Sequence, residues 1–275
     1  MKYCYLNDKI ISLDKAFVRI DDIGILRGYS VFDFLRTYDG KPFLLKEHLQ
    51  RLHNSAKLLS LELPVTDKKI ETLIYELLKK NNIKDAQVRI ILTGGRTIEG
   101  MGFDPKHPTC AILIEPLALP RAEFYKNGGK LITNTHLRYA HTAKTTNYIN
   151  AIALAEERKE KGAIEILYIF EDKVLECSTS NFFMVKDNIL ITPKNTILIG
   201  TTRNFVLKLV ANKILIEERD IRVSELQTAD EAFITATNKE VLPIVKIDSM
   251  TVGDGIVGKN TEKIMELFAS AVRSL

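Results

Sequence analysis

The chain has 275 residues, 45% of them hydrophobic, which is enough to bury the core of one large domain or of two smaller ones. Its formal net charge is only +4, and the sequence has no block of like charges. Both features argue against a nucleic-acid-binding surface. The N-terminus is charged too early for a signal peptide, and no uncharged apolar run could span a membrane, so no membrane partner is expected.

The first 115 residues predict β-hairpins followed by amphipathic helices. Apolar segments flank Asn7-Asp8 and again Asp39-Gly40, and both dipeptides favour tight hairpin turns. Helical spacing then predicts one helix over "KEHLQRLHNSAKLLSL" and a second one that begins near Thr66-Asp67. Two more strands are expected in "AQVRIILTGG" and "TCAILIEPL".

Two prolines in "EPLALPRAEFYKNGG" predict an interdomain loop at 116–125, between an N-terminal domain of 1–115 and a C-terminal domain of 126–275. The second domain should contain a strand in "KLITNTHLRY", a helix after Lys144, and a run of strands that turn at Glu171-Asp172 and Asp187-Asn188. A further helix, two strands and a closing helix from Thr261 follow. Hairpins with segregated helices predict an α+β fold of two layered domains, not a βαβ series.

Lys144 lies in a short polar turn, "HTAKTTN", directly before a predicted helix. Most lysines in such turns are solvated. A functional lysine needs its pKa lowered by burial or by neighbouring cations, so that the amine can attack a carbonyl. The position of Lys144 leaves both interpretations open.

Glu176 and Arg51 allow a similar choice. Glu176 ends a strand and precedes a polar cluster that comprises Ser178, Thr179, Ser180 and Asn181. It is either an ordinary strand-end glutamate or a carboxylate aimed at a buried cation, with short hydrogen-bonding side chains around it. Arg51 lies among apolar residues of a predicted helix. It is a surface arginine by default, but if it turns inward it needs a permanent anion such as a phosphate.

Two further segments could bind an anion. Gly200, Thr201 and Thr202 precede a helix, whose N-terminus offers unpaired N–H groups and a positive dipole end. Thr235, Thr237 and Asn238 form a small polar group at the end of a strand. Either segment could equally be an ordinary cap or strand end.

Cysteine and histidine spacing predicts free thiols and no metal site. The cysteines are odd in number and scattered, at Cys4, Cys110 and Cys177, which favours a cytoplasmic protein without disulfides. The histidines form the pairs His48/His53 and His136/His141. A spacing of five does not place both members on one helical face.

Taken in order, five motifs resemble the class IV aminotransferases, which are the fold type IV pyridoxal 5′-phosphate (PLP) enzymes. They are "RGYSVFDFLRTYDGKPFLLKEHLQRLHNSA", the lysine before a helix, "LECSTSNFF", "GTTRNFV" and "ITATNKEVLPI". The resemblance covers nearly the whole chain. It implies a two-domain α+β fold of the D-amino-acid aminotransferase type, with mixed sheets or a barrel and flanking helices. It also implies bound PLP and a homodimer.

The resemblance assigns roles residue by residue. Lys144 corresponds to the lysine that forms the Schiff base with the cofactor and moves the substrate proton. Glu176 corresponds to the carboxylate at the pyridine nitrogen, which favours the protonated ring that transamination needs. Arg51 corresponds to the phosphate-binding arginine. The other implied cofactor contacts are Tyr148, Ser180, Asn181, Thr201, Thr202, Thr237 and Asn238.

Substrate recognition matches the family less closely. Well-known D-amino-acid aminotransferases hold the substrate carboxylate with an arginine and a histidine on a loop where this chain has Glu99 and Met101. Branched-chain enzymes use a tyrosine and an arginine, and here the tyrosine position holds Gln87, although Arg89 is present.

Arg27 and Arg89 are the candidate replacements, with Phe32 beside them in the substrate site. Both arginines are interpreted as lying in apolar strands, where a guanidinium needs an anion. The combination of "ILRGY", "VRIILTGG" and "SNFF" resembles a subgroup of D-amino-acid aminotransferases in which an arginine pair from the neighbouring subunit holds the substrate carboxylate. A salt bridge of Arg27 with Asp21 or Asp22 is the structural alternative.

The function this implies is transfer of an amino group from a D-amino acid, such as D-alanine or D-glutamate, to 2-oxoglutarate or pyruvate. A branched-chain L-amino-acid aminotransferase, favoured by Tyr148 and "GMGF", is the first alternative. An aminodeoxychorismate lyase, which would use the same lysine to expel pyruvate, is the second. A PLP-binding protein without catalysis would leave Lys144 and Glu176 unexplained.

Overall fold

The computed structural model describes residues 2–274, which form two compact units. Unit 1 runs to Ala118 and also includes Ala143–Asn147, whereas unit 2 comprises Leu119–Thr142 and the residues from Tyr148 onward. The chain passes from unit 1 to unit 2 between residues 118 and 119. The short segment that contains Lys144 therefore packs with unit 1, although unit 2 flanks it on both sides in the sequence.

Unit 1 contains a sheet whose strands follow the order β2-β1-β6-β5-β3-β4, with every neighbouring pair antiparallel. The strands are β1 (Tyr3–Leu6), β2 (Lys9–Ser12), β3 (Ser30–Tyr38), β4 (Lys41–Pro42), β5 (Ala86–Thr93) and β6 (Thr109–Pro116). Both predicted hairpins are confirmed. Asn7 and Asp8 have φ values of 41° and 69°, and Asp39 and Gly40 have 44° and 81°, as tight hairpin turns require.

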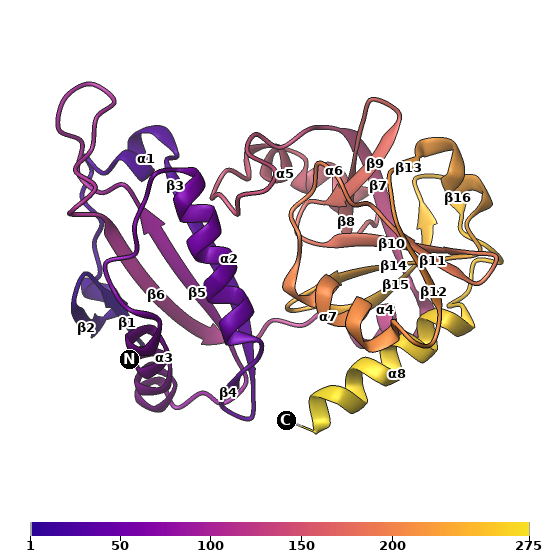
Figure 1. Cartoon of the computed structure of the whole chain (residues 1–275), viewed down its shortest axis with the longest axis horizontal. Helices are drawn as coiled ribbons and strands as arrows, with labels where there is room; N and C mark the ends of the chain where they lie inside the picture. The colour runs from indigo at the N-terminus through magenta and orange to yellow at the C-terminus, as the bar shows by residue number, and fades with distance from the viewer. Residues whose placement is uncertain (1, 275) are drawn as a thin grey trace. The chain divides into compact units, whose positions relative to one another are not determined.

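Helices α2 (Leu45–Leu58) and α3 (Asp67–Asn81) cover one face of this sheet (Figure 1). Both predicted helices are confirmed, and the hydroxyl of Thr66 caps the start of α3 by accepting from the N–H of Lys69. The covered strand positions alternate with half-buried ones, which line the opposite face. The remaining helical segments of unit 1 are the 3₁₀ turn η1 (Leu13–Lys15) and the short helix α1 (Ile23–Arg27).

Unit 2 contains a larger sheet of order β12-β11-β10-β14-β15-β7-β8-β9-β13, with β16 beside β15. The strands are β7 (Gly129–Thr135), β8 (Glu165–Phe170), β9 (Lys173–Cys177), β10 (Asn181–Lys186), β11 (Ile189–Thr192), β12 (Leu215–Glu218), β13 (Ile221–Arg222), β14 (Glu231–Ala236), β15 (Glu240–Ile247) and β16 (Met250–Thr251). The predicted turns at Glu171-Asp172 and Asp187-Asn188 are confirmed, and all four residues have positive φ.

Parallel pairs join β7 to β8, β11 to β12 and β15 to β7. Helices connect the first two of these pairs, so unit 2 contains two βαβ crossovers among its hairpins, which the sequence pattern did not predict. The overall α+β prediction is confirmed.

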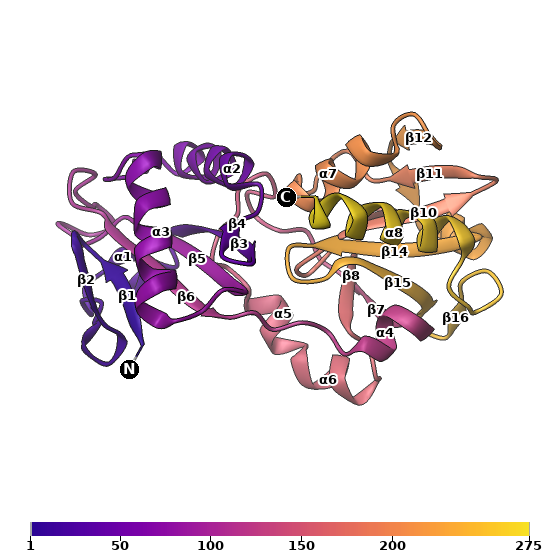
Figure 2. The same cartoon turned by 90° about the horizontal axis from the view of Figure 1, so that it is seen from below.

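The helices of unit 2 are α4 (Ala122–Asn127), α5 (Ile149–Ala153), α6 (Ala155–Glu160), α7 (Thr201–Val210) and α8 (Lys259–Arg273), with the 3₁₀ segment η2 (Val223–Thr228). Helix α8 runs along β14 and β15 (Figure 2). The single helix predicted after Lys144 is instead two short helices that meet at Leu154, and the first begins only at Ile149. Within residues 2–274, no helix is long and apolar enough to cross a membrane.

Candidate functional site

The turn that contains Lys144 is fixed to β3 and α2 of unit 1. The backbone N–H of Lys144 donates to the hydroxyl of Ser55 (3.0 Å), and its carbonyl accepts from the N–H of Phe32 (2.9 Å). Two residues further on, Thr146 bonds Ser30 through both backbone and hydroxyl. The side chain of Lys144 is half-buried, with its amine 4.7 Å from the ring centroid of Phe32. Of the two interpretations of Lys144, the half-buried amine disfavours that of a fully solvated turn lysine.

Arg51 turns inward from α2 and pairs with a buried aspartate. Its Nε lies 2.8 Å from Oδ2 of Asp33, and its Nη2 lies 2.8 Å from Oδ1. Asp33 is fully buried on β3, and the Nδ1 of His48 lies 2.6 Å from the same Oδ1. The surface position taken as the default for Arg51 is therefore wrong, and the anion that compensates it within unit 1 is a protein carboxylate.

The charge states in this group follow from the contacts. Burial opposes ionisation of Asp33, but the charge of Arg51 and the hydrogen bonds from Arg51 and His48 outweigh it and hold its pKa well below the usual range. Burial lowers the pKa of His48, and the charges of Arg51 and Lys144 lower it further against the opposing effect of Asp33. An ionised Asp33 only accepts hydrogen bonds, so the Nδ1 of neutral His48 donates to it.

Glu176 lies near the end of β9 in unit 2 and is buried. Its Oε1 accepts from Nε (2.9 Å) and Nη2 (2.5 Å) of Arg138 and from the N–H of Leu198 (3.1 Å). The adjacent guanidinium stabilises the carboxylate in its charged form. Within unit 2 the cation that faces Glu176 is therefore the guanidinium of Arg138, a residue that was not identified from the sequence.

The polar cluster after Glu176 surrounds a different carboxylate. The hydroxyls of Ser178, Thr179 and Ser180 all donate to Glu165, which is buried at the start of β8. The amine of Lys239 lies 2.8 Å from Oε1 of Glu165 and also donates to the hydroxyl of Thr179. Burial opposes ionisation of Glu165, but Lys239 and the hydroxyls outweigh it and lower its pKa. The prediction that these hydroxyls surround Glu176 is therefore wrong.

The N-terminus of α7 has the features of an anion site. Thr201 and Thr202 are buried in its first turn, and no side chain caps it at Gly200. A Cβ atom on Gly200 would lie 2.2 Å from Oδ1 of Asn181, so any other residue there would displace the Asn181 side chain. Asn181 donates to the carbonyl of Leu198 (2.7 Å) and pairs across the sheet with Thr235.

The hydroxyl of Thr235 is buried and has no hydrogen-bond partner within residues 2–274. A buried polar group of this kind favours a bound partner. Thr237 and Asn238 lie half-buried in the turn between β14 and β15, directly before Lys239. The hydroxyl and amide groups of Thr235, Thr237 and Asn238 could donate hydrogen bonds to a phosphate-bearing cofactor. In unit 1, the guanidinium of Arg51 and the amine of Lys144 have the same donor chemistry.

Tyr148 precedes α5 and lies near a second tyrosine, Tyr168. Burial raises the pKa of Tyr168 to about 12, and nearby Glu165, Tyr148 and Glu176 act in the same direction. Tyr148 therefore belongs to the same electrostatic neighbourhood as Glu176. No group of three or more His, Cys, Asp or Glu side chains in residues 2–274 could hold a metal ion.

Arg27 and Arg89 occupy different kinds of position. Arg89 lies on β5, as predicted, and its Nε is buried without a hydrogen-bond partner in residues 2–274. Arg27 ends helix α1 and is exposed, with Nη1 2.9 Å from the carbonyl of Leu26. The prediction of a strand at Arg27 is wrong because Asp22 caps a helix start and Gly28, at φ 67°, ends it.

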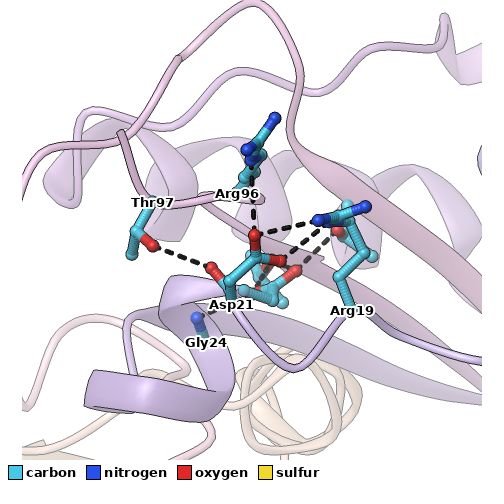
Figure 3. Close-up of polar contacts among 8 residues, drawn as sticks. Arg19, Asp21, Gly24, Arg96 and Thr97 are labelled. Carbon is cyan, nitrogen blue, oxygen red and sulfur yellow. Dashed lines mark hydrogen bonds and ion pairs between the residues drawn. The ribbon is translucent and has the colours of Figure 1, made fainter. Parts of the chain in front are cut away.

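The salt bridge considered for Arg27 is not formed. The carboxylate of Asp21 contacts Arg19 and Arg96 instead, and its backbone carbonyl accepts from Thr97 (Figure 3). Asp22 accepts from the N–H of Gly24 and from two threonine hydroxyls. These contacts fix the loop after β5. Glu99 and Met101 lie exposed in that loop.

Comparison with known proteins places the chain in one family. The family described as amino-transferase class IV matches residues 30–247. A putative branched-chain-amino-acid aminotransferase of Methanocaldococcus jannaschii is 34% identical over 96% of this chain and 94% of its own length. A D-alanine aminotransferase of Staphylococcus epidermidis is 31% identical over 100% and 99%.

Solved structures agree with this assignment. The T.th. branched-chain amino acid aminotransferase with pyridoxamine 5′-phosphate superposes with a TM-score of 0.92 at 27% identity, over 99% of this chain and 94% of that chain. The enzyme of Thermoproteus uzoniensis with norvaline gives 0.90 at 27% identity, over 99% and 95%. The chain therefore belongs to the class IV aminotransferases and is a PLP-dependent enzyme of fold type IV.

Proposed function

We propose that this aminotransferase takes the amino group from a D-amino acid, such as D-alanine or D-glutamate, and transfers it to a 2-oxo acid such as 2-oxoglutarate or pyruvate. The D-alanine aminotransferases among its full-length relatives support this substrate class. Arg89 on β5 also supports it, because it lies in a segment where this chain resembles a subgroup of D-amino-acid aminotransferases.

The observation that carries the proposal is the placement of Lys144 and Arg89 on one face of the unit 1 sheet. The amine of Lys144 lies over the ring of Phe32, and Arg89 is the cross-strand partner of Phe34, two residues further along that face. Two residues of a strand span about 7 Å. An amino acid that reacts at Lys144 could therefore present its carboxylate to Arg89, whose Nε lacks a partner in residues 2–274.

Roles for the cofactor contacts follow from their chemistry. When bound, PLP would supply an electron sink for the substrate α-carbon. Lys144 supplies the amine that holds the cofactor and then moves the proton of that carbon. Glu176, held by Arg138, keeps a proton at the ring nitrogen. The proposed phosphate ligands are Arg51, Thr201, Thr202, Thr237 and Asn238, and the other proposed cofactor contacts are Tyr148, Ser180 and Asn181.

We also propose that the enzyme is a cytoplasmic homodimer in which Arg27 of one subunit serves the substrate site of the other. Arg27 is exposed beside Ile25 and Leu26, which are also exposed, so this segment is available for such a contact. Mixing Arg27→Ala with Lys144→Ala protein tests it. Hybrid dimers should regain activity at one intact site, whereas two inactive parents that stay inactive would contradict the shared site.

A branched-chain L-amino-acid aminotransferase is the second candidate. It is favoured by the Methanocaldococcus jannaschii relative. The half-buried face that holds Arg89 is also largely apolar, with Phe32, Phe34, Ile91 and Leu113, and could accommodate an aliphatic side chain. An aminodeoxychorismate lyase has weaker support. The solved structure of a putative 4-amino-4-deoxychorismate lyase from Legionella pneumophila is only 23% identical to this chain, so the likeness extends to the fold alone.

Half-reactions separate these candidates. The PLP-loaded enzyme should lose its visible absorption band on addition of D-alanine or D-glutamate and regain it with pyruvate or 2-oxoglutarate. Loss of the band with L-leucine alone would contradict the D-amino-acid proposal and favour the branched-chain activity. Release of pyruvate from aminodeoxychorismate without an amino acceptor would favour the lyase.

A further inference from the structure

Asp33 occupies a position where the strand pattern calls for an apolar residue. Val31 and Leu35, two residues to either side on the same face of β3, are fully buried, and Asp33 is 0% exposed. Replacing a buried ion pair by apolar side chains is often neutral or stabilising. The stability of unit 1 therefore does not by itself account for a charged residue at this position.

Four donors converge on the Asp33 carboxylate. Two come from Arg51, one from His48 (2.6 Å) and one from the backbone N–H of Phe34 (2.7 Å). A guanidinium that bonds both oxygens of a carboxylate through Nε and Nη2 lies in the plane of that carboxylate and cannot rotate about its own bonds without breaking a contact. The Nη1 of Arg51 makes no hydrogen bond within residues 2–274, and 13% of the side chain is exposed.

The same part of α2 also anchors the turn that contains Lys144. The hydroxyl of Ser55 donates to the carbonyl of Arg51 (2.9 Å) and accepts from the N–H of Lys144 (3.0 Å). The backbones of Arg51 and Lys144 are therefore connected through one side chain. A contact that fixes Arg51 on β3 also defines where Lys144 lies relative to it.

We propose that Asp33 is a positioning residue, which orients Arg51 so that its remaining N–H groups bind the phosphate of PLP. This inference rests on the proposed function, because it takes Arg51 as a phosphate ligand. Asp33 itself touches neither cofactor nor substrate. His48 completes the arrangement by satisfying the Asp33 oxygen that Arg51 Nη2 also contacts.

Two effects of Asp33 on phosphate binding oppose each other. Its negative charge reduces the attraction between Arg51 and a phosphate dianion, whereas its two-point contact removes the conformational freedom of the guanidinium before binding. Orientation of the guanidinium is the larger of the two effects. Removing the charge by Asp33→Asn should therefore weaken phosphate binding, although simple electrostatics predicts the opposite.

Reconstitution of the apoenzyme with PLP and with pyridoxal, which lacks the phosphate, isolates this effect. Asp33→Asn should raise the Kd for PLP about 10-fold or more, the scale of a charge-assisted hydrogen bond. The Kd for pyridoxal should stay within about 3-fold of wild type, because the effect acts through the phosphate. An unchanged ratio of the two Kd values, or tighter PLP binding, would overturn the proposal.

Thr37→Val is the matched control. Thr37 is buried on the same strand and bonds the backbone of Lys84 and Ala86, remote from Arg51. This variant should lower stability without changing the ratio of the PLP and pyridoxal affinities. A change in that ratio as large as that of Asp33→Asn would show that general loosening of β3 suffices, and would overturn the positioning role.

If Asp33→Asn does not fold, Arg51→Lys tests the same claim. Lysine keeps the positive charge but cannot meet both oxygens of Asp33. A selective loss of PLP affinity supports orientation, and wild-type affinity contradicts it. Arg51→Ala separates this inference from the proposed function. If it leaves the ratio of affinities unchanged, Arg51 is not a phosphate ligand, whereas if it lowers PLP affinity and Asp33→Asn does not, only the role of Asp33 fails.

Discussion

Units 1 and 2 each arrange proposed cofactor residues around a buried carboxylate, but they compensate that carboxylate differently. In unit 1, Asp33 pairs directly with Arg51, itself a proposed ligand. In unit 2, Glu165 pairs with Lys239 and with three hydroxyls, which hold the segments on either side of the proposed ligands. A change at Asp33 therefore acts on one proposed phosphate ligand, whereas a change at Glu165 acts on the hydroxyl of Ser180, a proposed cofactor contact, and through Lys239 on the segment that carries Thr237 and Asn238.

The largest effect on activity should come from substitution of Lys144, the proposed cofactor-binding lysine of unit 1. Lys144→Ala should lower kcat by about 10³-fold or more, because it removes the amine that we propose both holds the cofactor and acts as the general base. Steady-state kinetics measures this, with the exposed Lys126→Ala as the control. A Lys144→Ala enzyme with more than a tenth of wild-type kcat would refute the role of the lysine.

Glu165→Gln should have the next largest effect and should act on unit 2 through stability. It leaves the largely buried amine of Lys239 without its counter-charge, which should lower the free energy of unfolding by about 3–5 kcal/mol. The double variant Glu165→Gln/Lys239→Met should recover much of this loss, because it removes the unpaired charge. Urea denaturation of the two variants measures both values. Equal stability of the single variant and wild type would show that the pair does not organise unit 2.

Ser55→Ala tests the link between α2 and the Lys144 turn. It removes the acceptor of the Lys144 N–H, which should lower the free energy of unfolding by about 1–3 kcal/mol. Hydrogen exchange should quicken at Lys144 and Thr146 more than in the core of unit 1. Unchanged exchange in the Lys144 turn would contradict the anchoring by Ser55.

The smallest expected effect is a pH dependence in unit 1. The pKa of His48 is lower in the folded protein than its ordinary value of 6.5, so the unfolded chain binds more protons between those two values. Stability should therefore fall as the pH drops below about 6.5, by less than about 1.4 kcal/mol per pH unit. His48→Gln should reduce this slope between pH 7.5 and pH 5.5 in chemical denaturation. A variant with the wild-type slope would show that His48 does not contribute.

Local signals in the sequence predicted most of the fold. The Asn7-Asp8 and Asp39-Gly40 turns and the Thr66 cap each determine structure through neighbouring residues, so they could be identified directly. The segment around Arg27 was misassigned, although Asp22 and Gly28 mark the ends of a short helix there. Its apolar residues suggested a strand because five residues are too few to show a helical period.

Long-range contacts of the candidate site could not be predicted in the same way. Asp33 and Arg51 are 18 residues apart, and Ser55 and Lys144 are 89 apart, so no local pattern connects them. An aspartate between Val31 and Leu35 on a buried strand face was nevertheless a usable signal, as was the spacing of His48 and Arg51 on one helix face. The hydroxyls after Glu176 were misinterpreted because Glu165, their partner, lies on a different strand.

The most direct test is to find which amine holds the cofactor. The wild-type enzyme is loaded with PLP and reduced with borohydride, and its peptides are then examined by mass spectrometry. We expect one pyridoxyl group, on Lys144 in the turn that β3 and α2 anchor. Modification of a different lysine, or of none, would contradict this expectation.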